Sequence, residues 1–293
     1  MKKFTLFALL ALAVTAFCAC GQIEDEDTSI PTLADPVHKG DAIKLDIPEK
    51  DSNGNVNALA ADYKYIELTE SGEFYLLKRG GDEVVSGEYE NAGNDNGTVK
   101  YKFKNLGNIN LEPMTKASGD IWRIILETGG KTISGFGSEM KRLEESEIVK
   151  ALCRSWTIVE TDVNITSGST SVEKTYPGGD LYAIASDLSK QGISIDASKL
   201  QGCSIKSISF TSGTTLAVNF NGTTYYGTFN GLSMSGKNSH NFSYSFAGKQ
   251  MGNPLFNANG SGVINWRKGK GVLTINVSSS SFSGSVTFNI SQR

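Results

Sequence analysis

The feature that most constrains this chain is the alternation of apolar and polar residues in short segments that begin at Tyr63. In the clearest of them, Val99, Tyr101 and Phe103 alternate with three lysines. Successive side chains of a strand point to opposite faces, so this pattern predicts strands with one buried face. The 32 glycines suit the turns between such strands, and only 6 prolines interrupt the chain. The sequence therefore predicts an all-β protein built from antiparallel sheets.

A two-residue turn at Asn221–Gly222 fixes the expected register in the second half of the chain. Pairing across this turn sets Phe220 opposite Thr223 and Val218 opposite Tyr225. The same face then carries a series of apolar residues, namely Leu216, Val218, Phe220, Tyr225, Phe229, Phe242, Tyr244 and Phe246. Tyr226 points the other way, and we expect it to be the most exposed of the large aromatic residues.

Two segments have helical periodicity and divide the chain. Ser138–Arg154 has one apolar and one charged side, and it is expected to be a helix that joins two β units. A shorter helix begins at Asp180, a good N-cap, and ends at Gly192. The expected organisation is a signal peptide (1–19), a flexible tether (20–46), an N-terminal β domain (47–137), the linker helix (138–154) and a C-terminal β domain (155–293).

A weak repeat relates the two β units. Ile66–Thr69 and Ile208–Thr211 both read as a strand before a turn, and Gly87 and Gly227 each begin a Gly-x-aromatic sequence further on. Duplication of one unit would produce this similarity. An antiparallel meander can also produce it by chance, and the sequence leaves both explanations open.

The first 27 residues resemble a bacterial lipoprotein signal. Lys2 and Lys3 precede an apolar run, Phe4–Phe17, that is too short to span the ~30 Å core of a bilayer. Cys20 follows, and the acidic Glu24–Asp27 behind it resembles the surface-export signal of Bacteroidetes lipoproteins. The resemblance implies a lipid on Cys20 and a location on the outer membrane, facing outward. The alternative is an ordinary secretory signal in which Cys20 is incidental.

The second β unit resembles a known family in four short motifs. They are Leu152–Trp156, Asp180–Ala185, Ser207–Gly213 and Tyr226–Phe229. Together they are similar to the lipocalin-like domains of Bacteroidetes outer-membrane lipoproteins, over about Ala151–Arg293 and more loosely over Tyr63–Phe136. The resemblance implies an up-and-down antiparallel barrel or a strongly curved sheet. That family is largely uncharacterised, so the resemblance implies a fold and a location but no reaction.

Catalytic and cofactor motifs are absent from the sequence. There are two histidines, His38 in the tether and His240, and there is no Gly-x-Ser-x-Gly or His-Glu-x-x-His sequence. The net charge is −3 and no basic patch is visible, which argues against nucleic acid as a partner. We therefore expect a protein that is not an enzyme and that has no cofactor and no metal site.

The residues left for function suggest binding. Tyr244 and Trp266 each combine an apolar body with one polar donor, and they are the predicted ligand contacts. The expected ligand is a small apolar molecule inside the second barrel. The alternative is a structural, adhesive or glycan-uptake accessory role with a carbohydrate or a partner protein. Cys153 and Cys203 either form a disulfide or remain two separate thiols, and the sequence does not specify an oligomeric state.

Overall fold

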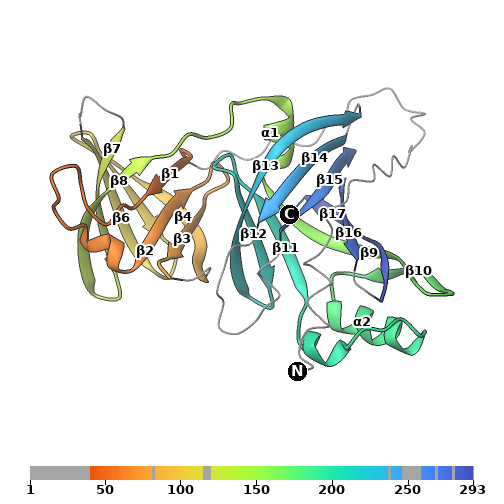
Figure 1. Ribbon diagram of the computed structural model, residues 1–293. Coiled ribbons are helices and arrows are strands. Elements are labelled where there is room, and N and C mark those ends of the chain that lie inside the picture. The colour runs from red at the N-terminus through yellow and green to blue at the C-terminus, as the bar shows by residue number, and fades with distance from the viewer. Residues whose placement is uncertain are drawn as a thin grey trace.

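The chain forms two β-barrels that lie side by side (Figure 1). The computed structural model describes residues 40–80, 83–114, 120–236, 239–245, 259–267, 270–278 and 281–292. Within these ranges the two barrels are antiparallel and a short helix lies between them, so the predicted all-β fold of two joined units is confirmed. In the same ranges, no helix is long and apolar enough to cross a bilayer.

The first barrel contains eight of the described strands. In chain order they are β1 (Ile43–Asp46), β2 (Tyr63–Leu68), β3 (Glu73–Lys78), β4 (Glu83–Asp95), β5 (Thr98–Phe103), β6 (Gly107–Met114), β7 (Ile121–Thr128) and β8 (Lys131–Glu139). The ring closes at β1, where Ile43 pairs with Leu68 of β2 and Leu45 pairs with Glu139 of β8. The predicted tether, residues 20–46, is therefore wrong for its last four residues, because they complete the barrel.

The second barrel is also a closed ring of eight strands within the described residues, with one more strand attached. Its strands are β9 (Ser155–Ser167), β10 (Thr170–Pro177), β11 (Ile205–Phe210), β12 (Thr215–Phe220), β13 (Thr223–Gly236), β14 (Ser239–Ser245), β15 (Asn259–Arg267), β16 (Lys270–Ser278) and β17 (Ser283–Gln292). The start of β9 pairs with β11, and β9 pairs with β17 along most of its length, which closes the ring. β10 pairs with the later part of β9.

The predicted register of β12 and β13 is confirmed. Phe220 pairs with Thr223, and Val218 pairs with Tyr225. The two turn residues, Asn221 and Gly222, both have positive φ. The predicted apolar face is buried in the second barrel, and its described members there are Leu216, Val218, Phe220, Phe229, Phe242 and Tyr244, with Tyr225 packed against them. Phe246 lies outside the described residues.

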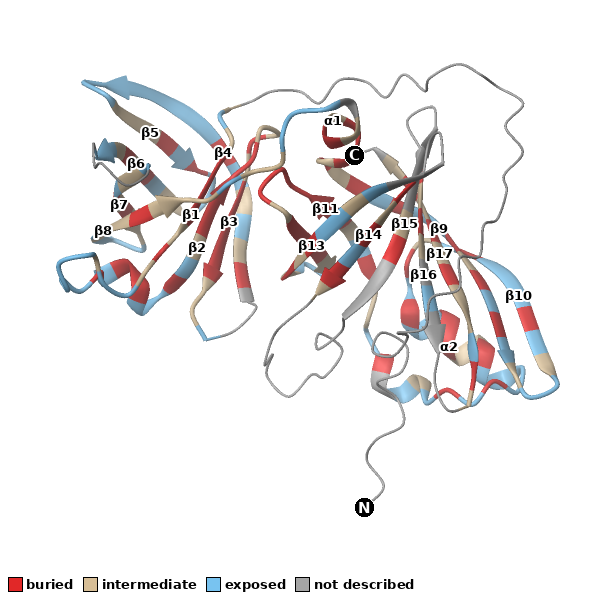
Figure 2. Cartoon of the chain, turned by 45° about the horizontal axis from the view of Figure 1, so that its top comes forward, coloured by how far each residue is buried: buried red, intermediate tan, exposed pale blue. Residues whose placement is uncertain are grey.

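Each barrel buries a cluster of apolar side chains, and Figure 2 shows buried residues in red along the strands of both barrels. In the first barrel the rings of Phe74 and Phe103 stack with centroids 4.1 Å apart. In the second, the ring of Phe210 meets those of Phe229 and Phe242 edge-on at 5.2 and 5.6 Å. The described rings therefore pack directly against one another in the two cores.

Short helices complete both cores. The 3₁₀ helix η2 (Ala58–Ala61) buries Leu59 in the first barrel. The helix α2 (Leu181–Lys190) packs Leu181, Ile184 and Leu188 into the second core, and η3 (Ala197–Leu200) adds Leu200. As predicted, Asp180 caps α2, because its Oδ1 accepts a hydrogen bond from the backbone N–H of Ala183 at 3.0 Å.

The linker between the barrels differs from its prediction. Only α1 (Glu147–Leu152) is helical within 138–154, and the residues between β8 and α1 form neither helix nor strand. The backbone N–H of Met140 donates to the carbonyl of Lys44 at 2.8 Å, and that of Leu143 donates to the carbonyl of Ser212 at 2.8 Å. These donors bind the two barrels instead of carbonyls one turn back, so a helix does not form there.

Candidate functional site

A buried ion pair lies in the seam between the barrels, which is the surface where their outer faces meet. Lys44 on β1 and Glu67 on β2 are paired across the two strands, and their side chains are 2% and 3% exposed. The Lys44 Nζ lies 3.8 Å from Glu67 Oε2. Ionised side chains at this depth are stable only when further hydrogen bonds satisfy them.

The second barrel supplies those hydrogen bonds. Lys44 Nζ donates to the carbonyl of Gly213 at 2.7 Å and to the hydroxyls of Thr215 and Tyr226, both at 2.9 Å. The ammonium therefore has three acceptors, all from the opposite barrel. Burial lowers the pKa of Lys44, and the adjacent Glu67 carboxylate opposes this change.

Glu67 is held in the same way. The hydroxyls of Thr211 and Thr215 each donate to its carboxylate at 2.5 Å. A Cβ added at Gly213 would lie 2.4 Å from Glu67 Oε1, so this turn between β11 and β12 accepts no larger residue without rearrangement. The seam therefore holds the barrels in one arrangement and fixes the surfaces that flank it.

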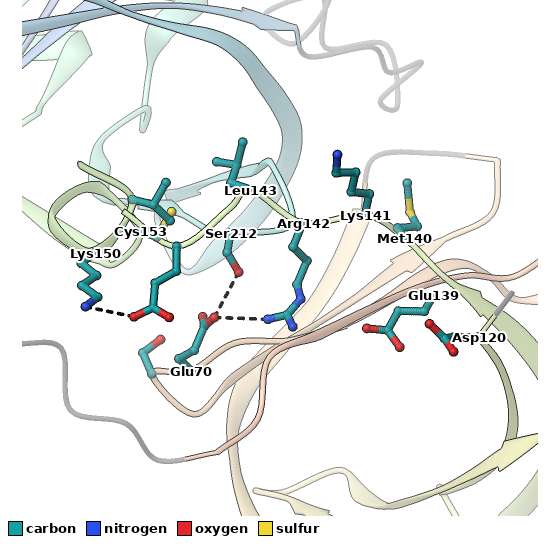
Figure 3. Close-up of a pocket in the computed structure, with 13 residues that line it drawn as sticks. Glu70, Asp120, Glu139, Met140, Lys141, Arg142, Leu143, Lys150, Cys153 and Ser212 are labelled. Atoms are coloured by element: carbon teal, nitrogen blue, oxygen red, sulfur yellow. Dashed lines mark hydrogen bonds and ion pairs between the residues drawn. The ribbon is translucent and has the colours of Figure 1, made fainter. Parts of the chain in front are cut away.

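An open groove of about 710 Å³ flanks this seam, and we call it the linker groove (Figure 3). It runs along the extended linker, between the β2–β3 turn of the first barrel and α1. Its lining residues are Glu70, Ser71, Asp120, Glu139, Met140, Lys141, Arg142, Leu143, Glu145, Val149, Lys150, Cys153 and Ser212. Its volume is within the range of about 300–1,000 Å³ that is usual for small-molecule sites.

The charges at one end of the linker groove are paired. Glu70 lies 3.5 Å from Arg142 and accepts a hydrogen bond from the hydroxyl of Ser212 at 3.2 Å, while Lys150 lies 2.9 Å from Glu145 (Figure 3). The two contacts of Glu70 join distant segments of the groove wall, whereas Glu145 and Lys150 are neighbours at α1. They shape the wall and leave little net charge at this end.

The other end of the groove carries two carboxylates, Asp120 and Glu139, which lie close together in Figure 3. Glu139 accepts a hydrogen bond from Trp122 Nε1 at 3.0 Å, and no ion pair within the described ranges involves either carboxylate. Lys141 is exposed on the linker between the two ends. The same two acidic residues also line a second hollow of about 430 Å³ at the open end of the first barrel.

Cys153 lies in the wall of the linker groove, half-buried. Burial, together with the nearby carboxylates of Glu70 and Glu67, raises the pKa of its thiol well above the usual range. Cys203 is also a free thiol, and burial raises its pKa too. Both cysteines are therefore protonated at neutral pH, and the structure has the two separate thiols rather than the alternative disulfide.

Of the two predicted ligand contacts, Tyr244 and Trp266, the structure describes the side chain of the first. Tyr244 is buried in the second core beside Phe242, where burial raises its pKa to about 12. The backbone of Trp266 lies in β15, opposite Gly271, and its side chain is outside the described residues. Cys20, the predicted lipidation site, is likewise outside the described residues.

The residues of the seam are missing from the sequence-based prediction. Tyr226 was expected to be exposed, and this is wrong, because the first barrel covers it and it binds Lys44. Lys44 fell in the predicted tether. In the sequence, Lys44 is a lysine between two apolar residues. Lysines are usually exposed to solvent, so this local pattern does not indicate burial.

Comparison with known proteins identifies no family, because no protein family and no curated protein matches the sequence. Among solved structures, a Bacteroides fragilis outer membrane protein is 7% identical, with a TM-score of 0.29, over 86% of this chain and 87% of that one. Transferrin Binding Protein B of Haemophilus parasuis, as a double mutant, is 11% identical, with a TM-score of 0.26, over 86% of this chain and 44% of that one. This chain thus spans less than half the length of that protein, and scores this low assign neither function nor location.

Proposed function

We propose that this chain is a non-catalytic binding protein, anchored by a lipid on Cys20 at the outer membrane and exposed at the cell surface. The observation that carries the proposal is the linker groove, an open space of about 710 Å³ whose walls carry both charged and apolar side chains. In the second barrel, by contrast, the described rings of Phe210, Phe229 and Phe242 pack against one another. We therefore assign binding to the linker groove.

The non-catalytic role rests on the chemistry of the groove residues. Cys153 is the thiol in the groove wall, and its raised pKa keeps it protonated. His240, the one histidine within the described ranges, is buried on β14, and burial lowers its pKa. It is not among the groove residues, so the groove brings no thiolate–imidazole pair together.

The partner that suits the linker groove is a segment of another protein with a basic side chain. Asp120 and Glu139 would accept that cation at one end, because neither is engaged in an ion pair with a described residue. Met140, Leu143 and Val149 offer apolar contact beside them. A mixed wall of this kind is typical of surfaces that bind proteins rather than free apolar ligands.

Site-specific photo-crosslinking on intact cells tests this function. A photoreactive residue at position 141, on the groove wall, should form a defined adduct with one partner protein, and the same residue at the exposed position 131 should not. The double change Asp120→Asn and Glu139→Gln should abolish the adduct. Adducts that are identical at the two positions, or that persist in the double variant, would contradict the proposed site.

The anchor is tested separately. Cys20→Ala removes the sulfur that would carry the lipid, so the variant protein should move from the membrane fraction to the soluble fraction. A Cys18→Ala variant is the matched control and should remain with the membrane. Retention of the Cys20→Ala protein in the membrane would exclude lipid anchoring at this residue.

A further inference from the structure

We propose that a second groove, separate from the linker groove, binds a short segment of a neutral carbohydrate. This serine groove has a volume of about 500 Å³ and lies on the seam between β3 and β4 of the first barrel and β9, β11, β12 and β13 of the second. Its hydroxyl and amide side chains are those of Tyr75, Ser86, Asn105, Ser155, Ser207, Ser209, Asn219 and Thr224. It shares no lining residue with the linker groove.

The origin of the serine groove is visible in the strand register of the first barrel. Lys44 of β1 pairs with Glu67 of β2, Glu67 pairs with Tyr75 of β3, and Tyr75 pairs with Ser86 of β4. These four residues form one row across four neighbouring strands. The row lies at the seam, because Lys44 and Glu67 bind the second barrel there and Tyr75 packs on Ala217.

The second barrel presents an equivalent row. Ser155 of β9 pairs with Ser209 of β11, Ser209 pairs with Ala217 of β12, and Ala217 pairs with Tyr226 of β13. The two rows occupy matching strands of the two barrels, in agreement with the weak sequence repeat. The two rows run in opposite directions along the seam. Lys44 of the first row therefore meets Tyr226 of the second, and Ser86 lies at the same end as Ser155.

The two ends of the seam are filled differently. At one end, Lys44 and Tyr226 meet, and they close the space with a hydrogen bond of 2.9 Å. At the other end the matching positions are Ser155 and Ser86, and both line the serine groove. Ser155 thus occupies the position that corresponds to Lys44, and Ser86 the position that corresponds to Tyr226. Because serines are smaller, the volume that a lysine and a tyrosine would occupy remains open.

The chemistry of the serine groove matches a neutral, hydroxyl-rich ligand. Ser86 donates to Thr224 at 3.0 Å and Ser209 donates to Ser155 at 3.0 Å. Each hydroxyl has one donor and two acceptor positions. Thr224 also accepts from Asn219 Nδ2 at 3.4 Å, so the acceptor positions that these pairs leave for ligand hydroxyls lie on the serines. Asn219 adds an amide at the same wall. These groups offer hydrogen bonds without a net charge, which is what sugar hydroxyls require.

The remaining lining residues support the same ligand class. Glu88 and Lys104 at the rim form an ion pair at 3.1 Å, so their charges compensate each other. Glu73 accepts a hydrogen bond from the hydroxyl of Tyr75 at 3.1 Å. Leu106 and Ala217 contribute apolar surface, against which the C–H face of a pyranose ring can pack.

The test uses the full mature chain and an array of neutral oligosaccharides, with titration calorimetry on each glycan that binds. The variant Ser86→Tyr with Ser155→Lys copies the filled end of the seam and should weaken binding about tenfold or more. Its thermal unfolding should resemble that of the wild type. Ser134→Tyr, at an exposed serine of β8 outside the groove, is the matched control and should bind like the wild type.

Two results would overturn the proposal. One is the absence of binding to every neutral oligosaccharide of the array by the folded wild-type protein. The other is wild-type affinity in the filled variant. If the double variant fails to fold, Ser86→Tyr alone decides the matter in the same way, because Ser86 is exposed on β4. Neither result depends on the linker groove, so the proposed function is tested independently.

Discussion

At the scale of single residues, Lys44 does most to join the two barrels. Its ammonium makes three hydrogen bonds to the second barrel while it stays within 3.8 Å of Glu67 in its own. Removing one member of a buried ion pair leaves the other charge without compensation, whereas removing both charges is less harmful. The pair therefore specifies how the barrels meet more than it adds net stability.

We predict that Lys44→Met destabilises the protein by about 3–5 kcal/mol, because Glu67 stays buried without its cation. Lys44→Met combined with Glu67→Gln should lose less than Lys44→Met alone. Urea unfolding of the wild type, both single variants and the double variant measures the coupling free energy. Losses that simply add would show that the two side chains act independently, and would contradict this account of the seam.

Buried tyrosines determine how stability depends on pH in alkaline solution. Burial raises the pKa of Tyr101 and of Tyr244 to about 12, from a usual value of 10.0. The folded protein then keeps phenol protons that the unfolded chain releases, so the stabilisation is complete below pH 10 and is lost as the pH rises toward 12. The lowered pKa of Lys44 acts in the opposite direction, but it is a single group.

The free energy of unfolding should therefore fall between pH 10 and pH 12. Urea unfolding at pH 8, 10 and 11 measures the change, and tyrosinate absorbance in native buffer follows the ionisation itself. A stability that is constant or rises over this range would show that these phenols are not buried in the folded state.

At the scale of the elements, the helix α2 closes part of the second core, and its first turn depends on Asp180. Asp180→Ala removes the acceptor for the Ala183 N–H and should lower the free energy of unfolding by about 1 kcal/mol. Asp180→Asn keeps a capping oxygen and should lose much less. Equal losses in the two variants, measured by urea unfolding, would assign the effect to the negative charge rather than to the cap.

Elements that depend on local sequence could be predicted. The pairing of Val218 with Tyr225 follows from the two-residue turn between their strands, and the α2 cap follows from Asp180. The predicted linker helix is longer than the observed one. The sequence has helical periodicity, but the backbone N–H groups of Met140 and Leu143 donate to the barrels instead. A local pattern contains no information about such distant partners.

The candidate site lay beyond prediction for the same reason. Tyr226 alternates with Tyr225 and so points out of its own barrel, as expected. Tyr226 is buried because the first barrel covers it. The position of that barrel cannot be predicted from a short segment of sequence. The two grooves likewise form where the first barrel and the linker meet the second barrel and α1, so their lining residues come from segments far apart in the chain.

At the scale of the whole molecule, the two barrels behave as one body in this account. The seam buries an ion pair, a tyrosine cluster and the pairing of β4 with β13, where Thr224 pairs with Val84. Both grooves exist only while the barrels keep this arrangement. If the seam opened freely, the walls of each groove would separate and neither would present a fixed binding surface.

Differential scanning calorimetry of the mature protein measures whether the two barrels unfold together. We predict one unfolding transition whose calorimetric and van't Hoff enthalpies agree, because neither barrel unfolds without breaking the shared seam. Gly213→Ala, which places a methyl group against Glu67 and Lys44, should split or broaden that transition. Two separate transitions in the wild-type protein would contradict the account, since the barrels would then be independent and the grooves between them would not be fixed sites.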